Sequence, residues 1–372
     1  MKSCLTGLKE KSQWNGYLSG LVEKAQMKGC LTGRKEKSQM KGCLTALCLL
    51  LSSLLVPGVA LAHHGVASLG AAGLEGPGAP IETSSSATLP KGSGLTYLKV
   101  DHADFEKFTD ARDDETDHYT FWMFGLGYGL TSWFSGYVFL PYNVKVLEDN
   151  SFNTSDFADI SLMGVLGFNY DAGLKLVPEN ESLDDMEDWH FTTYGGLSLP
   201  TGDANVRDSK GNIDPGLSTG FGEPTFSAGV TATKPISNRL TLANEVSYIY
   251  FLEYSYHDGN RTQFGDEFRA NTALSCRLLT APESKLRLDA NLEANYLKLG
   301  RDETNGVGEL ATGGHILYVV PGVRSYWKNM SAGLGVKLPA WTDLNEEDDQ
   351  QGAEGKENYR LILTVSALFS VF

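Results

Sequence analysis

Charged residues of both signs occupy alternate positions of neighbouring segments. In residues 264–278 and 285–297, most residues at one set of alternate positions are apolar, and most residues at the positions between them are polar or charged. If that polar face lines a channel, opposite charges across it set a transverse field that selects solutes. The same side chains can instead pair and fill the interior of a closed barrel, and both interpretations stay open. The predicted lumen-facing row is Glu245, Glu267, Arg269, Arg277, Arg287, Asp289 and Glu293.

Two adjacent histidines, His63 and His64, are the candidate metal ligands. They would stand at the amino terminus once the leader described below is removed. An α-amino nitrogen and an imidazole on one residue suit Cu or Zn. The alternative is a flexible chain end that holds no metal. The other five histidines are dispersed without ligand spacing.

Two acidic clusters lie in segments that are predicted to be loops on the cell exterior. Carboxylates there could hold Ca or Mg between the protein and anionic lipopolysaccharide, whereas such runs are otherwise simply solvated. We therefore expect no obligatory cofactor. The clusters are Asp110, Asp113, Asp114, Glu115 and Asp117, and Glu346, Glu347, Asp348 and Asp349.

Hydrolytic chemistry has little support in the sequence. Tyr256-His257-Asp258 and Gly314-His315 supply histidines, but no GxSxG motif provides a matching nucleophile. The sequence therefore predicts that the chain is not an enzyme, and a barrel hydrolase is the rival interpretation from another functional class.

The elements that must position the charged row are predicted to be strands. From about Leu95 onward, segments of alternating polarity are separated by turn residues, and no run of apolar residues is long enough for a helical membrane span. Tight turns alternate with long polar loops, as in outer-membrane barrels. We expect one antiparallel transmembrane β-barrel of about twelve strands. Aromatic girdles are predicted from Tyr119, Trp122, Trp133, Phe134, Tyr248, Tyr250, Tyr326, Trp327 and Trp341.

The amino-terminal part has a different organisation. Residues 1–39 contain near-copies of the segment that begins at Met40, which indicates a duplicated and mis-assigned extension. Residues 40–62 have the order of a secretory signal peptide, with Lys41, an apolar stretch and a small-residue cleavage site. Residues 63–93 are rich in Gly, Ala and Ser and are predicted to form an arm or plug, followed by the barrel at 94–372.

The charge balance excludes a nucleic-acid partner. The chain has a formal net charge of −15, from 31 basic and 46 acidic residues. Residues 1–62 hold nine of the basic and three of the acidic residues, so their removal leaves 22 and 43 and a net charge of −21. A polyanion would be repelled by such a surface.

Short motifs carry a resemblance to a known family. They are the phrase from Gly125 to Trp133 (GLGYGLTSW), the triplet Leu140-Pro141-Tyr142, and Leu199-Pro200-Thr201-Gly202-Asp203. With these motifs the sequence resembles outer-membrane transporters grouped as the MetA-pathway phenol-degradation family. The resemblance spans most of residues 95–372 and implies passage of small, hydrophobic or aromatic, compounds across the membrane.

Together these features predict a porin-like channel in the outer membrane of a Gram-negative bacterium. The expected partners are outer-membrane lipid, lipopolysaccharide, the barrel assembly machinery and a small-molecule solute. The main alternative is a non-conducting barrel that acts as a structural, adhesive or metal-binding surface protein.

Overall fold

The structure is a computed structural model of the chain, and it describes residues 78–105, 116–147, 153–170, 172–178, 188–345 and 357–370. The predicted extension 1–39, the predicted signal peptide 40–62 and the beginning of the predicted arm lie outside these residues. Among the described residues, no helix is long and apolar enough to cross a membrane.

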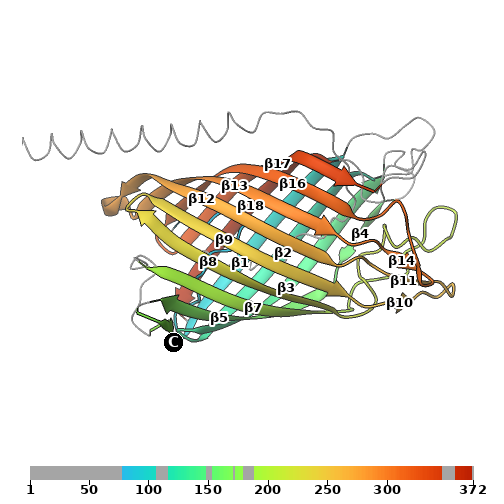
Figure 1. Cartoon of the computed structure of the whole chain (residues 1–372), viewed down its shortest axis with the longest axis horizontal. Helices are drawn as coiled ribbons and strands as arrows, with labels where there is room; N and C mark the ends of the chain where they lie inside the picture. Colours follow the sequence, from blue (N-terminus) through green and yellow to red (C-terminus); the bar gives the residue numbers. More distant parts are fainter. Residues whose placement is uncertain are drawn as a thin grey trace, which may run out of the picture. The chain divides into compact units, whose positions relative to one another are not determined.

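Twelve long antiparallel strands form one closed barrel (Figure 1). Each strand pairs with its neighbours along the chain, and β1 pairs with β18 to close the sheet. The predicted fold class and strand number are therefore confirmed. The strands are β1 (Ser93–Phe105), β2 (Thr116–Thr131), β3 (Phe134–Leu147), β5 (Ile160–Tyr170), β7 (Trp189–Leu199), β8 (Thr225–Ser237), β9 (Leu240–Phe251), β12 (Glu267–Ala281), β13 (Leu286–Leu299), β16 (Gly314–Trp327), β17 (Met330–Leu344) and β18 (Glu357–Ser370).

Among the described residues, six shorter strands lie outside this closed ring. Two of them pair with barrel strands: β4 (Thr154–Phe157) pairs with β3, and β6 (Leu174–Leu176) pairs with β5. The other four form a separate sheet in the loops: β10 (Tyr254–Ser255), β11 (Arg261–Gln263), β14 (Glu303–Thr304) and β15 (Val307–Gly308).

The two ends of the barrel differ in their connections. One end has tight turns between β2 and β3, β8 and β9, β12 and β13, and β16 and β17; the 3-10 helix η1 (Pro282–Ser284) forms the third of them. The other end has long connections, of which 200–224, 252–266 and 300–313 are fully described. Short turns face the periplasm in bacterial barrels, so the long loops face the exterior.

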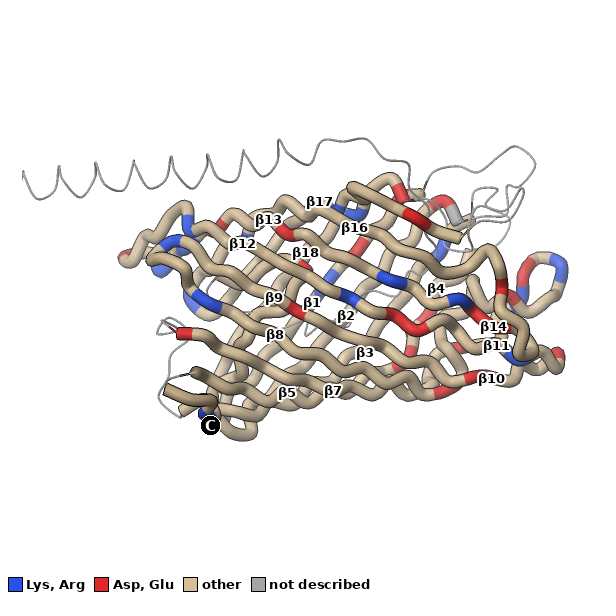
Figure 2. The backbone as a smooth tube through the Cα atoms, viewed as in Figure 1, with Lys and Arg blue, Asp and Glu red and all other residues tan. Residues whose placement is uncertain are grey.

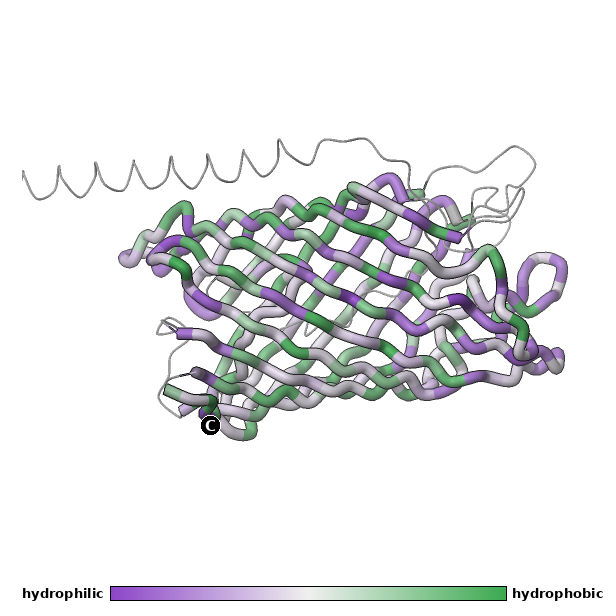
Figure 3. Tube along the Cα trace, viewed as in Figure 1, coloured by the Kyte–Doolittle hydropathy of each residue, from purple (hydrophilic) through white to green (hydrophobic). Residues whose placement is uncertain are grey.

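The outer surface of the barrel is apolar and the inner surface is largely polar. Hydropathy alternates along the strands in Figure 3, as side chains on a strand alternate between two faces. Outward aromatic residues include Trp122, Tyr248, Tyr250, Trp327 and Trp341, which are exposed as girdle residues should be. The prediction for Tyr119 is wrong: this residue faces inward and donates its hydroxyl to Asn143 at 2.9 Å, because it lies in phase with the inward Phe121 and Met123. The girdle prediction is also wrong for Tyr326, which lies opposite the inward Arg287 in the strand register and accepts a hydrogen bond from Ala79.

Candidate functional site

The interior of the barrel is occupied by the described end of the predicted arm. We call residues 78–92 the arm; its residues 78–89 are all buried. The arm starts beside Tyr326 near the periplasmic turns, where the backbone N–H of Ala79 donates to the Tyr326 hydroxyl at 3.0 Å. It returns to the same end, where Thr88 donates to the carbonyl of Ser132 at 2.5 Å. The arm is thus a loop inserted into the lumen from the periplasmic side.

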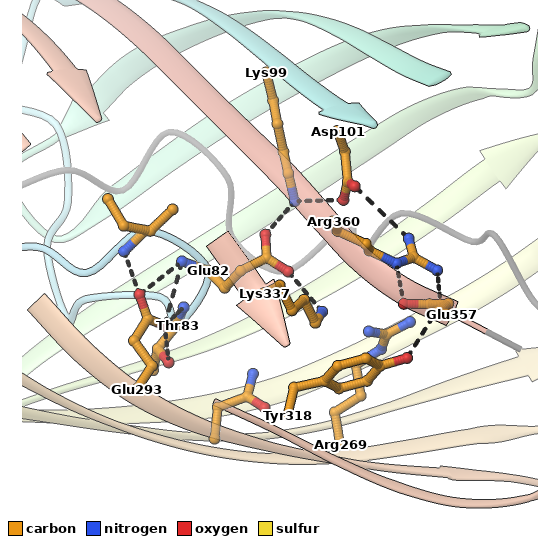
Figure 4. A network of polar contacts seen from close by, with 12 residues as sticks. Glu82, Thr83, Lys99, Asp101, Arg269, Glu293, Tyr318, Lys337, Glu357 and Arg360 are labelled. Carbon is orange, nitrogen blue, oxygen red and sulfur yellow. Dashed lines mark hydrogen bonds and ion pairs between the residues drawn. The ribbon is translucent and has the colours of Figure 1, made fainter. Parts of the chain in front are cut away.

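Glu293 on β13 holds the middle of the arm. Its carboxylate accepts the backbone N–H groups of Ile81 at 2.5 Å, Glu82 at 3.1 Å and Thr83 at 2.7 Å. The hydroxyl of Thr83 adds a fourth hydrogen bond at 2.7 Å (Figure 4). Consecutive N–H groups that converge on one anion form a nest, and hydrogen bonds to a charged group are stronger than neutral ones.

Glu245 on β9 holds the next arm residue in a similar way. Ser84 donates its backbone N–H at 3.1 Å and its hydroxyl at 2.9 Å to the two oxygens of this carboxylate. The wall residues Tyr194 and Asn271 also donate to Glu245, at 2.7 Å and 3.1 Å. The carboxylate therefore binds wall and arm together.

Glu82 is the arm's own contribution to the polar network. One of its oxygens contacts the ammonium of Lys99 on β1, and the other accepts from Lys337 on β17 at 2.9 Å (Figure 4). Burial would raise the pKa of the Glu82 carboxyl, but the charges of Lys337 and Lys99 outweigh burial and hold the pKa below its usual range. The carboxylate is thus ionised at neutral pH and locked between two cations.

A second buried cluster lies toward the exterior. Arg360 on β18 makes a two-pronged contact with Glu357, with one nitrogen at 2.8 Å, and lies 3.7 Å from Asp101 on β1. The hydroxyl of Tyr318 also donates to Glu357, at 3.2 Å. Each of these side chains is buried, so their charges compensate one another rather than being hydrated.

The structure places the predicted charged row inside the barrel. Glu245, Glu267, Arg269, Asp289 and Glu293 are all buried. Arg269 pairs with Glu267 at 2.5 Å, and Arg287 with Asp289 at 2.7 Å. Arg277 is half-buried and lies directly opposite Asp289 in the strand register. Figure 2 marks such charged positions along the strands, and their burial explains how they occur at membrane depth. Their role in a solute pathway stays a prediction.

Aromatic side chains cover another part of the inner surface. A buried apolar cluster is formed by strands β1, β2, β3, β5 and β7, together with Leu89 of the arm. Its aromatic members are Tyr97, Phe105, Tyr119, Phe121, Tyr137, Phe139 and Tyr194. The lumen thus has an aromatic part and a part rich in paired charges.

The wall has a glycine where the arm passes closest to it. A Cβ atom on Gly129 of β2 would lie 2.2 Å from the carbonyl oxygen of Pro90 and 2.7 Å from that of Leu89, both backbone atoms of the arm. Only a residue without a side chain allows this approach.

We expect Gly129→Ala to loosen the arm, because the added methyl group overlaps arm backbone that cannot rotate away. Overpacking of this kind costs about 1–3 kcal/mol, which corresponds to roughly 5- to 150-fold faster hydrogen exchange of the arm amides. The matched control is Gly195→Ala on β7, where the nearest atom to the new Cβ is 3.9 Å away. Equal exchange rates in both variants would contradict close arm packing.

Most of the candidate metal ligands lie outside the residues that the structure describes. His63, His64, the acidic residues from Asp110 to Glu115 and those from Glu346 to Asp349 lie outside the described residues. Asp117 is described and contacts His118 at 2.9 Å. Within the ranges that the structure covers, no three His, Cys, Asp or Glu side chains are grouped to hold a metal ion.

Sequence reasoning missed half of the charged interior. The wall residues that were not predicted as lumen residues are Lys99, Asp101, Arg324, Lys337, Glu357 and Arg360, and Glu82 of the arm was not predicted as the partner of the two lysines. The sequence held a signal for the two lysines, because each lies between two apolar residues of its strand: Lys99 between Leu98 and Val100, and Lys337 between Val336 and Leu338. In a membrane barrel such a charge must face the lumen.

Comparisons with known proteins agree with this architecture. The family model described as "Putative MetA-pathway of phenol degradation" matches residues 114–284, which contain the three motifs of the resemblance. A search of the curated proteins gave no match. An outer membrane channel from Pseudomonas putida F1 has a similar fold, with a TM-score of 0.58 and 13% identity over 77% of this chain and 98% of that one. The β domain of the Bordetella autotransporter BrkA has a TM-score of 0.42 and 10% identity over 74% of this chain and all of the other.

The family match confirms the resemblance that the motifs indicated, and the closed barrel with its apolar outer surface agrees with it. The chain is therefore an outer-membrane β-barrel of a Gram-negative bacterium, and its residues 114–284 match the model of the MetA-pathway family.

Proposed function

We propose that the protein is a channel for the passive passage of small solutes and that the arm is its gate. The observation that carries this proposal is the way in which the arm is held. It is bound by hydrogen bonds and ion pairs to single wall side chains, chiefly Glu293, Glu245 and Lys337. Each of these bonds involves a charged group and contributes about 1.5–3 kcal/mol, and water can replace such contacts when the arm moves.

In this proposal the described state is the closed one. Arm and wall side chains together fill the middle of the lumen, and the cavity beside Glu82 measures only about 10 Å³, which is room for about one water molecule. Displacement of the arm toward the periplasm would free a path between the aromatic part and the charged part of the wall. The aromatic part supports passage of solutes with a hydrophobic or aromatic portion.

The same filled lumen favours a second candidate, a non-conducting structural barrel. In that case the arm is a permanent part of the core, and the buried charges serve only stability. Contacts with lipopolysaccharide and with the barrel assembly machinery are expected for both candidates, so they do not distinguish the channel from the structural barrel. An enzyme is not proposed: His257 lies in the loop between β10 and β11, and His315 on β16 shares a 2.7 Å hydrogen bond with the hydroxyl of Tyr296.

A reversible lock on the arm distinguishes channel from structural barrel. In a chain whose five native cysteines are serines, we introduce Ser86→Cys and Thr231→Cys, since these two hydroxyl oxygens are 2.7 Å apart. We expect the oxidised protein to be silent in planar bilayers and the reduced protein to conduct. The control pair Thr192→Cys and Thr231→Cys links two wall strands whose hydroxyls are 2.5 Å apart, and should conduct in both states.

Each contrary result has one meaning. Conductance that does not change on oxidation of the Ser86→Cys pair would show that the arm is not the gate. A folded barrel that stays silent in both redox states, in the lock and in the control, would favour the structural role.

A further inference from the structure

Glu82 is the single ionisable residue in residues 78–90, the part of the arm inside the lumen. Its carboxylate lies between Lys99 and Lys337, with one oxygen facing each ammonium. The side chains of Glu82, Lys99 and Lys337 have exposed fractions of 3%, 4% and 7%, so this is an enclosed site rather than a surface ion pair.

The two lysines depend on that carboxylate. Lys99 has one further acidic contact, Asp101 at 3.7 Å, and Asp101 is shared with Arg360. Lys337 also lies over the ring of Tyr318, 4.5 Å from its centroid, but an aromatic ring does not replace an anion. Its charge also acts on Glu357, but that carboxylate is already paired with Arg360. A buried ammonium without a counter-charge is strongly unfavourable. When the arm leaves the lumen, the lysines therefore present an anion site that is no longer filled.

We propose that Lys99 and Lys337 form the binding site for the carboxylate group of the transported solute, and that Glu82 occupies this site in the closed state. This inference rests on the proposed channel function. The solutes are thereby assigned to the class of small organic carboxylates.

The geometry favours a carboxylate over other anions. Each lysine contacts a different oxygen of one planar carboxylate, so the two ammonium groups are spaced to match an anion with two oxygens. The adjoining 10 Å³ cavity is lined by Leu297, Tyr318 and the amide side chains of Asn271 and Asn295, among others. The site thus offers apolar and aromatic contacts beside the charge, as the remainder of a small organic acid requires.

Chemical rescue tests the site without any need for conduction. Glu82→Ala in the full chain removes a fragment of the size of acetate and leaves both lysines in place. We expect hydrogen exchange of the arm amides to be accelerated in this variant and to be slowed again by sodium acetate, saturably and by about tenfold or more. Acetamide, and sodium chloride at equal ionic strength, should have no such effect. Rescue should also be absent in Glu82→Ala/Lys337→Gln.

The outcomes are separable. The proposal would be overturned if acetate gave no rescue, or if the rescue persisted without the Lys337 ammonium. Equal rescue by chloride would also overturn it, because the site would then bind anions without preference for a carboxylate. Should Glu82→Ala fail to fold, reversal potentials in a sodium acetate gradient are measured for Gly129→Ala channels with and without Lys99→Gln and Lys337→Gln. Anion selectivity that is unchanged by these lysine variants would reject the site. A complete lack of conductance in the reversible-lock experiment would count against the channel alone, because the rescue assay does not depend on it.

Discussion

Glu293→Leu is expected to free the arm and to raise the channel's open probability by about 100-fold. The reason is the number of arm groups that converge on this one carboxylate: three backbone N–H groups, of Ile81, Glu82 and Thr83, and the Thr83 hydroxyl. Hydrogen bonds to a charged group contribute about 1.5–3 kcal/mol each, and their loss is only partly offset by water. A net loss of about 3 kcal/mol gives the expected factor.

Two measurements check this prediction. Hydrogen exchange followed by mass spectrometry should show faster exchange in peptides that cover residues 78–92, with strand amides unchanged. Planar-bilayer recordings should show more frequent openings. The control is Asn291→Leu on the same strand and inner face, because Asn291 is buried and the described residues offer its amide atoms no hydrogen-bond partner. An arm that exchanges as slowly in Glu293→Leu as in this control would contradict the assigned role of Glu293.

The barrel itself could be predicted because its signal is repeated. Period-two alternation around β12 and β13 determines which side chains face lipid, and a register shift of one residue would move every charge into hydrocarbon. The inward positions of Glu267 and Arg269 follow from that rule alone. Tyr119 shows its limit, since an aromatic residue near a strand end suits a girdle and an interior equally well.

The site could be predicted only in part, for a physical reason. The contacts between arm and wall join residues far apart in the chain, such as Thr83 and Glu293, and no local pattern encodes such a pairing. A Gly/Ala/Ser-rich segment also has no periodicity that would indicate its docked position. The alternation within the strands identifies wall charges such as Glu267, whereas the partner of Lys337 is visible only in the three-dimensional structure.

Arg360→Met is expected to cause the largest loss of stability, about 3–5 kcal/mol in the free energy of unfolding. It would leave the carboxylates of Glu357 and Asp101 buried at the same place without their shared cation. Urea denaturation of the folded protein in micelles, followed by tryptophan fluorescence, measures the change. The double variant Glu357→Leu/Arg360→Met should recover most of the loss, because paired removal of buried charges is often nearly neutral. The control Arg261→Met breaks an exposed pair with Glu253, whose side chains are 51% and 38% exposed, and should cost less than about 1 kcal/mol. If the double variant is as unstable as Arg360→Met alone, the uncompensated carboxylate of Glu357 is not the cause, and the arginine acts through packing instead.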